Sequence, residues 1–563
     1  MLRSLAFVLY LLAAPGWAQT ASDTASRDQI EHRRAAERQQ RQREMLQRGA
    51  DVRGATDAPL APLEWPAQET PCFPIRDIVL TGAGSDRFRF ILQDLIAGPD
   101  PAIGRCLGAK GVDVAAERAQ RALVAHGYVT TRLLVQPQSF DAGRLVLSVV
   151  PGRLRASRFA DGTSARATAI NAVPARPGDI LNLRDIEQAL ENFKRVPSVE
   201  SEIVIEPAVA PDESDLVIAW QQSNPLRLNA SLDDSGTRAT GRYQGSVTVS
   251  YDHWWTLNDL FYVTYTHDLG GGVPGIRGTN GKTVHYSLPW GRWLLGFTAS
   301  HSNYHQNVAG PFEIFTYSGS SDNADLTLSR VLHRDARGKT SLSLKAWARR
   351  SDNFINDAEV EPQRRATGGW ALGLAHRQAF NHATLDLQIE HRRGTAAFNA
   401  RPAPEEEFAE GTSRLRVTSF DASLQVPWRL ADRRGRYQLS LRGQWNGTPL
   451  AAPDRFAIGG RYTVRGFDGE TSLSADRGLL MRNEFAVAIG DTAHEAYVGI
   501  DYGQVSGPSA EWLAGDHLAG AVLGIRGGAG VLAYDVFVGR PISRPAAFRP
   551  TPVVAGFSLS ASF

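Results

Sequence analysis

From about residue 225 to the end of the chain, apolar and polar residues alternate along short segments that are separated by turn residues. Successive side chains of a β-strand point to opposite faces, so this alternation predicts strands with one apolar and one polar face. The last segment has the clearest pattern, with Ser558, Ser560 and Ser562 on one face and, on the other, Val553, Ala555, Phe557, Leu559, Ala561 and Phe563. We expect sixteen strands, over residues 226–235, 243–254, 259–269, 281–290, 292–305, 315–334, 339–350, 366–380, 382–393, 413–427, 435–446, 478–489, 494–505, 517–527, 531–541 and 551–563.

Sixteen alternating strands in one stretch are typical of a transmembrane β-barrel, which takes an even number of antiparallel strands. A closed barrel pairs every strand with two neighbours, so no backbone polar group meets lipid unpaired. The apolar face of each strand would then meet lipid, and the polar face would meet a water-filled lumen. Soluble β-sandwich domains are the alternative, because their strands alternate too. The length of the strand-rich region, the secretory signal described below and the final Phe563 favour the barrel.

Two shorter regions before the barrel share one order of elements: strand, helix, helix, strand, strand. The first covers residues 72–152, and the apolar spacing of its second helix ends at Gly127, a residue typical of a helix terminus. The second covers residues 153–222, where we expect a short helix over 165–172 and a longer one over 182–198. Two tandem copies of one order predict two small α+β domains of the same kind.

The N-terminus has the features of a secretory signal peptide over residues 1–18. Arg3 supplies a positive charge, a short apolar run follows, and Gly16 and Ala18 are the small residues that precede a cleavage site. The apolar run is too short to span a bilayer as a helix, although a signal anchor is the alternative. The pattern predicts a protein that leaves the cytoplasm.

The region from residue 19 to residue 49 is polar, and residues 27–48 are rich in Arg, Gln, Glu and Ala, with no Gly or Pro. These residues favour a helix, but too few of them are apolar to bury one face in a protein core. We therefore expect a helix that lies in a polar cavity and plugs a resting pore; a mobile charged arm is the alternative. Residues 50–71 contain four prolines and are expected to form an extended linker.

Charge and cysteine content argue against several classes of partner and site. The chain has 61 basic and 59 acidic residues, a balance that indicates neither a nucleic-acid partner nor an acidic substrate. Its two cysteines, Cys72 and Cys106, would lie in an oxidising compartment, which favours a structural disulfide over a metal site that needs further ligands. His494-Glu495 lacks the second histidine of a zinc helix, and residues 270–278 lack the end of a phosphate-binding loop. We expect no enzyme activity, no metal and no cofactor.

Five local features occur together along the chain. They are CFPI at Cys72, the helix-forming segment 178–198, the tetrapeptide VRGF at 464–467, the segment GIDYG at 499–503, and the final Phe563. VRGF precedes the fifth-from-last expected strand and GIDYG lies in the strand after that one, a placement far more specific than the tetrapeptide itself. By these features the chain resembles the two-partner secretion transporters, the family of haemolysin and filamentous-adhesin secretion proteins.

The resemblance implies a mainly β architecture that agrees with the segments above. A plug helix region (19–49) and the linker (50–71) would precede two α+β polypeptide-transport-associated (POTRA) domains, over 72–152 and 153–222. A 16-stranded antiparallel transmembrane barrel would occupy residues 223–563. The resemblance also implies that the barrel-assembly machinery reads Phe563 during biogenesis.

The function implied by the resemblance is protein export. The POTRA domains would capture an unfolded exoprotein in the periplasm, and the barrel would carry it through the outer membrane without ATP. The partner would be a large secreted β-helical protein, whether a cytolysin, an adhesin or a contact-dependent toxin, and no nucleic acid would take part. An assembly factor that inserts other barrels is the alternative, because it shares the superfamily, the barrel and the loop motif. Such factors usually carry more periplasmic repeats, which favours export.

The alternation of side chains also predicts a site inside the barrel. Val498, Ile500 and Tyr502 share the face expected to meet lipid, so Gly499, Asp501 and Gly503 face the lumen and leave its wall bare. The loop 447–477 is long, which is typical of a functional loop. We expect it to fold into the lumen. Its motif consists of Val464, Arg465, Gly466 and Phe467.

Each residue of the loop motif has an expected part. Gly466 permits a tight bend, Phe467 would pack on the bare wall, and the guanidinium of Arg465 would form two hydrogen bonds with Asp501. The alternative places Arg465 in solvent at the cell surface. A second candidate site is the helix in the second α+β domain, whose apolar residues would either help to capture substrate or only pack the domain core: Leu183, Ile186, Leu190 and Phe193.

Overall fold

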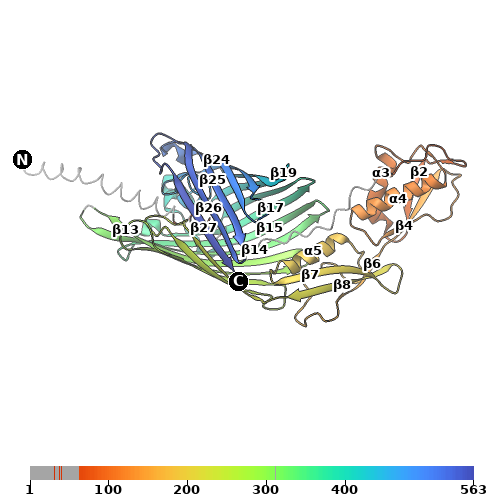
Figure 1. Cartoon of the computed structure of the whole chain (residues 1–563), viewed down its shortest axis with the longest axis horizontal. Coiled ribbons are helices and arrows are strands. Elements are labelled where there is room, and N and C mark those ends of the chain that lie inside the picture. The colour runs from red at the N-terminus through yellow and green to blue at the C-terminus, as the bar shows by residue number, and fades with distance from the viewer. Residues whose placement is uncertain (1–30, 32–33, 35–36, 39, 41–62, 311) are drawn as a thin grey trace, which may run out of the picture.

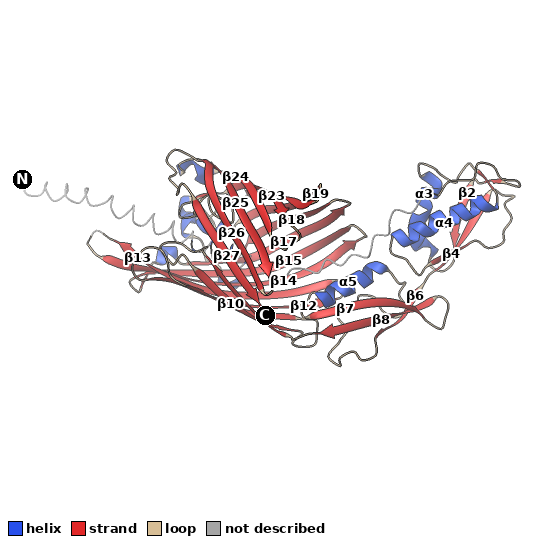
Figure 2. Cartoon of the chain, viewed as in Figure 1, coloured by secondary structure: helices blue, strands red, loops and turns tan. Residues whose placement is uncertain are grey.

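The computed structural model describes residues 31, 34, 37, 38, 40, 63–310 and 312–563 of the chain. The expected signal peptide and most of the expected plug helix and linker lie outside these residues. Figure 1 shows a barrel at one end, a small domain beside it and a second small domain farther away. Figure 2 shows that the longer helices belong to the two small domains, whereas the barrel consists of strands. Among the described residues, no helix has the length and apolar character needed to cross a bilayer.

The barrel is a closed antiparallel sheet in which each strand pairs with the next and β27 pairs with β9. The described residues form the sixteen long strands of the barrel wall, and the two-residue β16 (Ala358–Glu359) extends one hairpin. The barrel strands are β9 (Leu226–Asp233), β10 (Gln244–Asp252), β11 (Leu260–Asp268), β12 (Arg277–Trp290), β13 (Trp293–Ala309), β14 (Ile314–Arg334), β15 (Gly338–Ile355), β17 (Arg365–Phe380), β18 (Ala383–Gly394), β19 (Arg416–Leu430), β20 (Arg433–Asn446), β23 (Arg477–Ala488), β24 (Glu495–Ser506), β25 (His517–Ala529), β26 (Leu532–Ser543) and β27 (Val554–Ser562). The sixteen expected strands are confirmed, with ends that differ by a few residues.

The two faces of the barrel wall differ in polarity as the alternation predicts. Exposed apolar side chains point outward, among them Val247, Leu326 and Leu559. Buried polar side chains point inward, such as Thr248 and Ser250, which alternate with the outward valines of β10. An apolar exterior around a polar interior is the arrangement of a barrel that stands in a lipid bilayer.

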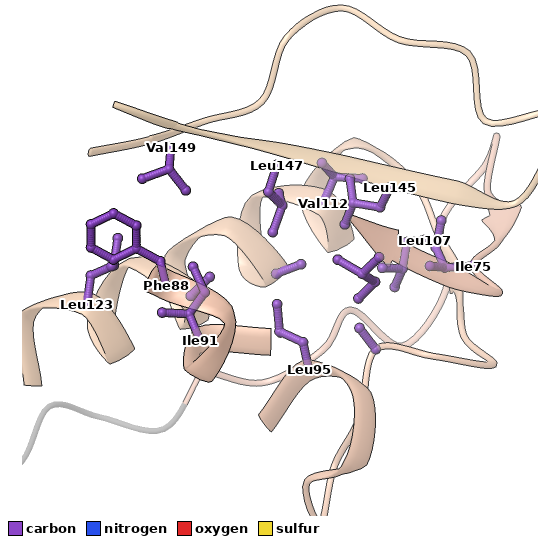
Figure 3. Close-up of a cluster of buried hydrophobic side chains, with 14 residues drawn as sticks. Ile75, Phe88, Ile91, Leu95, Leu107, Val112, Leu123, Leu145, Leu147 and Val149 are labelled. Atoms are coloured by element: carbon purple, nitrogen blue, oxygen red, sulfur yellow. The ribbon is translucent and has the colours of Figure 1, made fainter. Parts of the chain in front are cut away.

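The first small domain packs two helices against a three-stranded sheet of order β2-β5-β4. Its core joins Phe88, Ile91 and Leu95 from the helical side to Leu145 and Leu147 of the sheet (Figure 3). Cys72 and Cys106 form a disulfide beside the short β1–β3 pair, so the pairing expected from the two cysteines is present. The elements are β1 (Phe73–Pro74), β2 (Asp77–Thr81), η1 (Ser85–Ile91), α3 (Leu92–Ala97), β3 (Cys106–Leu107), α4 (Ala109–Ala125), β4 (Arg132–Leu134) and β5 (Arg144–Val150).

The second small domain consists of β6 (Arg153–Phe159), α5 (Leu183–Lys194), β7 (Val199–Pro207) and β8 (Glu213–Gln222). Its sheet has the order β6-β8-β7, and α5 covers one face.

The short helix expected over 165–172 is wrong, because these residues form turns. Asn171 explains the difference: its side chain donates hydrogen bonds to the backbone oxygens of Leu257, in the turn between β10 and β11, and of Pro289, near the end of β12. Asn side chains that bond to backbone groups compete with helix formation.

The second domain is fixed to the barrel through the charged side of α5. Glu191 accepts hydrogen bonds from Arg334 at 2.7 Å and from Lys339 at 2.8 Å, at the turn that joins β14 to β15. Asp185 accepts one from Arg292, at 2.7 Å, in the turn between β12 and β13. Burial at this joint lowers the pKa of Arg195 to about 10, which leaves its side chain charged at neutral pH. The joint sets the direction in which the domain extends from the barrel.

Candidate functional site in the barrel lumen

The connection between β20 and β23 folds back into the barrel. It contains a small hairpin of β21 (Phe456–Ile458) and β22 (Leu473–Ala475), and the VRGF motif lies at the tip between them. The side chains at the tip are covered, with Arg465 6% exposed and Phe467 1% exposed. A tip at the cell surface would be exposed, so the structure agrees with a loop that lies inside the lumen.

Arg465 and Asp501 face each other in this buried site. Arg465 Nε lies 2.7 Å from Asp501 Oδ2, and Arg465 Nη2 lies 2.8 Å from Asp501 Oδ1, so the guanidinium binds the carboxylate with two parallel hydrogen bonds. The backbone N–H of Arg465 adds a third hydrogen bond to Asp501, at 2.9 Å. Asp501 is fully buried. The structure therefore brings together the two residues that the sequence pairs.

A second carboxylate completes the site, and the sequence reasoning missed it. Glu484 of β23 accepts a hydrogen bond from Arg465 Nη1 at 2.5 Å and also pairs with Arg526 of β25. Arg482 Nε also lies 3.7 Å from Asp501, so both carboxylates have more than one cation within 4 Å, and this matters because an unpaired buried charge is strongly destabilising. Glu484 stands directly opposite Gly499, on the face that lines the lumen, and this register between β23 and β24 comes from the structure and not from the sequence pattern.

Glycines let the loop tip approach the wall. A Cβ atom at Gly499 would lie 2.5 Å from Arg465 Nη2, and one at Gly503 would lie 2.9 Å from Val464 Cγ2. The tip also meets two glycines that the sequence reasoning did not select: a Cβ at Gly520 would lie 1.9 Å from Arg465 O, and one at Gly539 would lie 3.0 Å from Gly466 Cα. These four glycines lie on β24, β25 and β26, at the places where the loop tip contacts the wall.

The bend of the tip depends on Gly466. Its φ is +101°, in the left-handed region that side-chain-bearing residues avoid, and a Cβ there would lie 2.4 Å from the carbonyl oxygen of Arg540. Phe467, the next residue, packs with Val464, Leu518 and Phe548 in an apolar cluster between loop and wall. The bend therefore directs Arg465 to the charged site and Phe467 to the apolar one.

The described residues of the expected plug helix also lie in the lumen. Thr240 Oγ1 donates a hydrogen bond to Glu31 at 2.9 Å, and Arg34 donates to the backbone oxygens of Ser235 and Asp468, each at 3.2 Å. Arg34 thus joins the barrel wall to the inward loop. Glu37, Arg38 and Gln40 line a cavity of about 440 Å³ with polar residues of the wall and the loop.

The remaining predicted residues lie elsewhere. Ile186 and Phe193 of α5 are buried in the core of the second domain, and Leu183 and Leu190 pack against the same core. These side chains pack the core of the domain, one of the two functions expected for them, while Leu183 and Leu190 remain partly exposed; a part in substrate capture stays a prediction. Phe563 follows β27, where its N–H donates a hydrogen bond to Leu228 O at 2.9 Å and its ring is exposed.

Comparisons with known proteins agree with this arrangement. The family model described as haemolysin secretion/activation protein ShlB/FhaC/HecB matches residues 212–527. A ShlB-type POTRA model matches residues 73–152, and a further POTRA model matches residues 153–207.

Individual relatives are similar over most of the chain. It is 35% identical, over 99% of its length and 98% of the relative, to outer membrane transporter CdiB-2 of Burkholderia pseudomallei. It is 25% identical to the hemolysin transporter protein ShlB of Serratia marcescens, over 78% of this chain and 76% of the relative. The solved structure of CdiB from Acinetobacter baumannii superposes with a TM-score of 0.83 at 30% identity, covering 96% of this chain and 99% of that one.

Replacing Arg465 by Ala tests whether the charged site holds the loop tip. The change leaves Asp501 and Glu484 buried without their shared cation, at a cost of about 3–5 kcal/mol in comparable pairs. We expect the tip to leave the wall, so that added trypsin cuts after Arg455 or Arg461 in the loop of the purified, folded barrel.

Arg442→Ala is the matched control, because Arg442 also faces the lumen but pairs with Asp421, at 2.8 Å, and not with the loop tip. Trypsin should cut this variant as slowly as the unaltered protein. Equal cleavage of the Arg465 variant and the unaltered protein would contradict the role assigned to the site.

Proposed function

This chain belongs to the haemolysin secretion/activation family of ShlB, FhaC and HecB, and from that premise we propose that it exports one large exoprotein through its own barrel. It is a two-partner secretion transporter of the outer membrane, with POTRA domains in the periplasm. The observation that carries the proposal is the content of the lumen: an inward loop and polar helical residues fill a polar channel and are held there by a few charged contacts. The proposal includes no catalytic step.

The open edge of the second POTRA domain supports a capture site for unfolded substrate. In the sheet order β6-β8-β7 both outer strands are edges, but residues 178–181 bond to the start of β6. Strand β7 spans nine residues and, among the described residues, has no strand on its outer side. Unpaired backbone groups of such an edge can bind an extended segment as an added strand.

The polar lumen supports export of the captured chain. Arg34 bonds to the loop at Asp468, and the loop is bound to the wall at Asp501, so the N-terminal segment and the loop form one connected closure. When the N-terminal segment leaves the lumen, the loop loses one of its partners. The periplasm has no ATP, so folding of the emerging exoprotein outside the cell would drive its movement.

The class of exoprotein is suggested by the two kinds of relative. The CdiB transporter of Burkholderia pseudomallei matches nearly the full length of the chain, whereas the hemolysin transporter ShlB matches a smaller part at lower identity. We therefore place the partner with the exoproteins of CdiB-type transporters, a large secreted β-helical protein. During biogenesis the barrel-assembly machinery would act on the C-terminal strand with Phe563.

Deletion of the gene for this protein tests the export function. One large protein should disappear from the culture medium and the cell surface, as measured by mass spectrometry of both fractions. Other outer-membrane barrels should keep their normal amounts, because an exporter serves its own partner only. A general loss of outer-membrane barrels would instead indicate an assembly factor.

A photo-cross-linking amino acid at Val204 tests the capture edge. Val204 lies on β7 with half of its side chain exposed, so an added strand would contact it. We expect a cross-link to the exoprotein in living cells when export is stalled. The same amino acid at Lys194, an exposed position at the end of α5, is the control and should give little product. Equal labelling at both positions would argue against strand addition at β7.

Removing residues 19–49 tests the closure. Without this segment the polar channel should conduct ions, so planar bilayers with the truncated protein should carry a larger steady current. Arg34→Ala should raise the frequency of brief openings, because it removes the bonds to Ser235 and Asp468. An unchanged current after truncation would mean that the segment is not part of the closure.

A further inference from the structure

A row of charged side chains crosses the outer, lipid-facing surface of the barrel. Lys282, His301, Asp322 and Arg350 are direct cross-strand partners on β12, β13, β14 and β15. They share the face of Val284 and Leu326, which are exposed apolar residues of the same strands. Charged groups on such a face are unfavourable within the apolar part of a bilayer, so the row needs an explanation.

The height of the row supplies part of that explanation. Trp293 marks the periplasmic end of β13, because the adjacent Arg292 pairs with Asp185 of α5. His301 lies eight positions farther along the strand. At about 3.3 Å per residue and a tilt of about 40°, this distance places the row roughly 20 Å above Trp293, in an apolar band about 25 Å tall. The row therefore stands just inside the outer-leaflet edge of this band, where long side chains such as Lys282 and Arg350 can extend to the layer of lipid headgroups.

A groove of about 490 Å³ lies against this row. Its floor consists of Ala299, Ala324 and Ala348, which are cross-strand partners of one another. On each strand the alanine lies two residues closer to the periplasm than the charged residue. Their small side chains leave a hollow where neighbouring rows carry larger groups such as Phe297 and Leu326.

Phe398, in the loop after β18, forms one side of the groove. Its side chain is 57% exposed, and its φ of +60° is uncommon for an aromatic residue. Gly368 lets the ring approach the wall, since a Cβ there would lie 3.0 Å from Phe398 Cδ2. An exposed ring held by an unfavourable backbone conformation is a feature that clusters at ligand contacts.

We propose that this groove binds a phosphorylated glycolipid of the outer leaflet, with phosphates of its head group at Lys282 and at Arg350 and an acyl chain along the alanine floor. The groove is continuous with the surface that meets lipid, and the ammonium and guanidinium groups complement a phosphate. Asp322 does not oppose an anion strongly, because it lies beside Arg350 and its Oδ1 is 2.8 Å from His301 Nδ1.

A bound lipid would support one of the long hairpins of the barrel. Strands β13 and β14 have 17 and 21 residues, and their hairpin extends away from the second domain, beyond the shorter strands (Figure 1). The groove lies at the base of this extension. A lipid held there would brace the hairpin beside the exit of the channel, which adds a binding function to the proposed export function.

Binding of hexa-acylated lipid A with two phosphates to the purified full-length protein in detergent tests the proposal. Native mass spectrometry should count one lipid that resists removal. The double variant Lys282→Gln/Arg350→Gln should bind it about tenfold or more weakly, because both phosphate partners are lost. Ala348→Phe should weaken binding through the floor and leave both cations in place. Arg393→Gln is the control, an exposed outward arginine on β18 outside the groove, and should bind normally.

The lipid itself provides a second comparison. Lipid A without phosphates should bind the unaltered protein as weakly as intact lipid A binds the double variant. Each variant is first shown to be a folded barrel by its altered electrophoretic mobility before and after heating. Undiminished binding to the double variant, or equal binding of lipid A with and without phosphates, would overturn the proposal. A loss in Arg393→Gln as large as that in the double variant would also overturn it, because the charge of the whole wall would then be responsible.

Discussion

The buried contact between Arg465 and Asp501 is the interaction on which the arrangement of the lumen depends. Asp501 has no exposed surface, so its charge is tolerable only if a cation reaches it. Arg482 of the wall lies 3.7 Å from Asp501, but the cation that binds this carboxylate with two parallel hydrogen bonds is Arg465. Arg465 comes from a loop that joins two neighbouring strands of the wall, and it can reach the site only when the loop folds inward. The inward position of the loop and the buried charge of Asp501 on the wall therefore depend on each other.

The glycines of the wall leave the space that this contact needs. Any side chain at Gly499 or Gly520 would occupy space that Arg465 fills, so the charged contact and the bare wall require each other. Glu484 and Arg526 extend the contact to two further strands, β23 and β25. Arg465 thereby binds the loop tip to β23 and β24 at once, and the proposed opening of the channel would have to break both contacts.

The joint between the second domain and the barrel uses the same chemistry at the periplasmic end of the channel. Glu191 holds Arg334 and Lys339, and Asp185 holds Arg292, so one side of α5 belongs to the barrel while the other belongs to the domain core. Strand β7 is left as the open edge. A substrate bound there would be presented by a domain whose direction is fixed, which links capture to the entrance of the channel.

The sequence by itself determined what repeats locally along the chain. Apolar and polar residues alternate with a period of two, and this alternation predicted the barrel strands, the face that meets lipid and the inward direction of Asp501. Gly466 indicated the bend that directs Arg465 toward Asp501. Tertiary structure decided what depends on register between distant segments. Glu484 meets Arg465 only through the alignment of β23 with β24, and the groove near Lys282 and Arg350 exists only because four strands align their residues. The turn at Asn171 was likewise set by barrel hairpins far along the chain, since a side chain follows the strongest hydrogen bonds that the whole fold offers it.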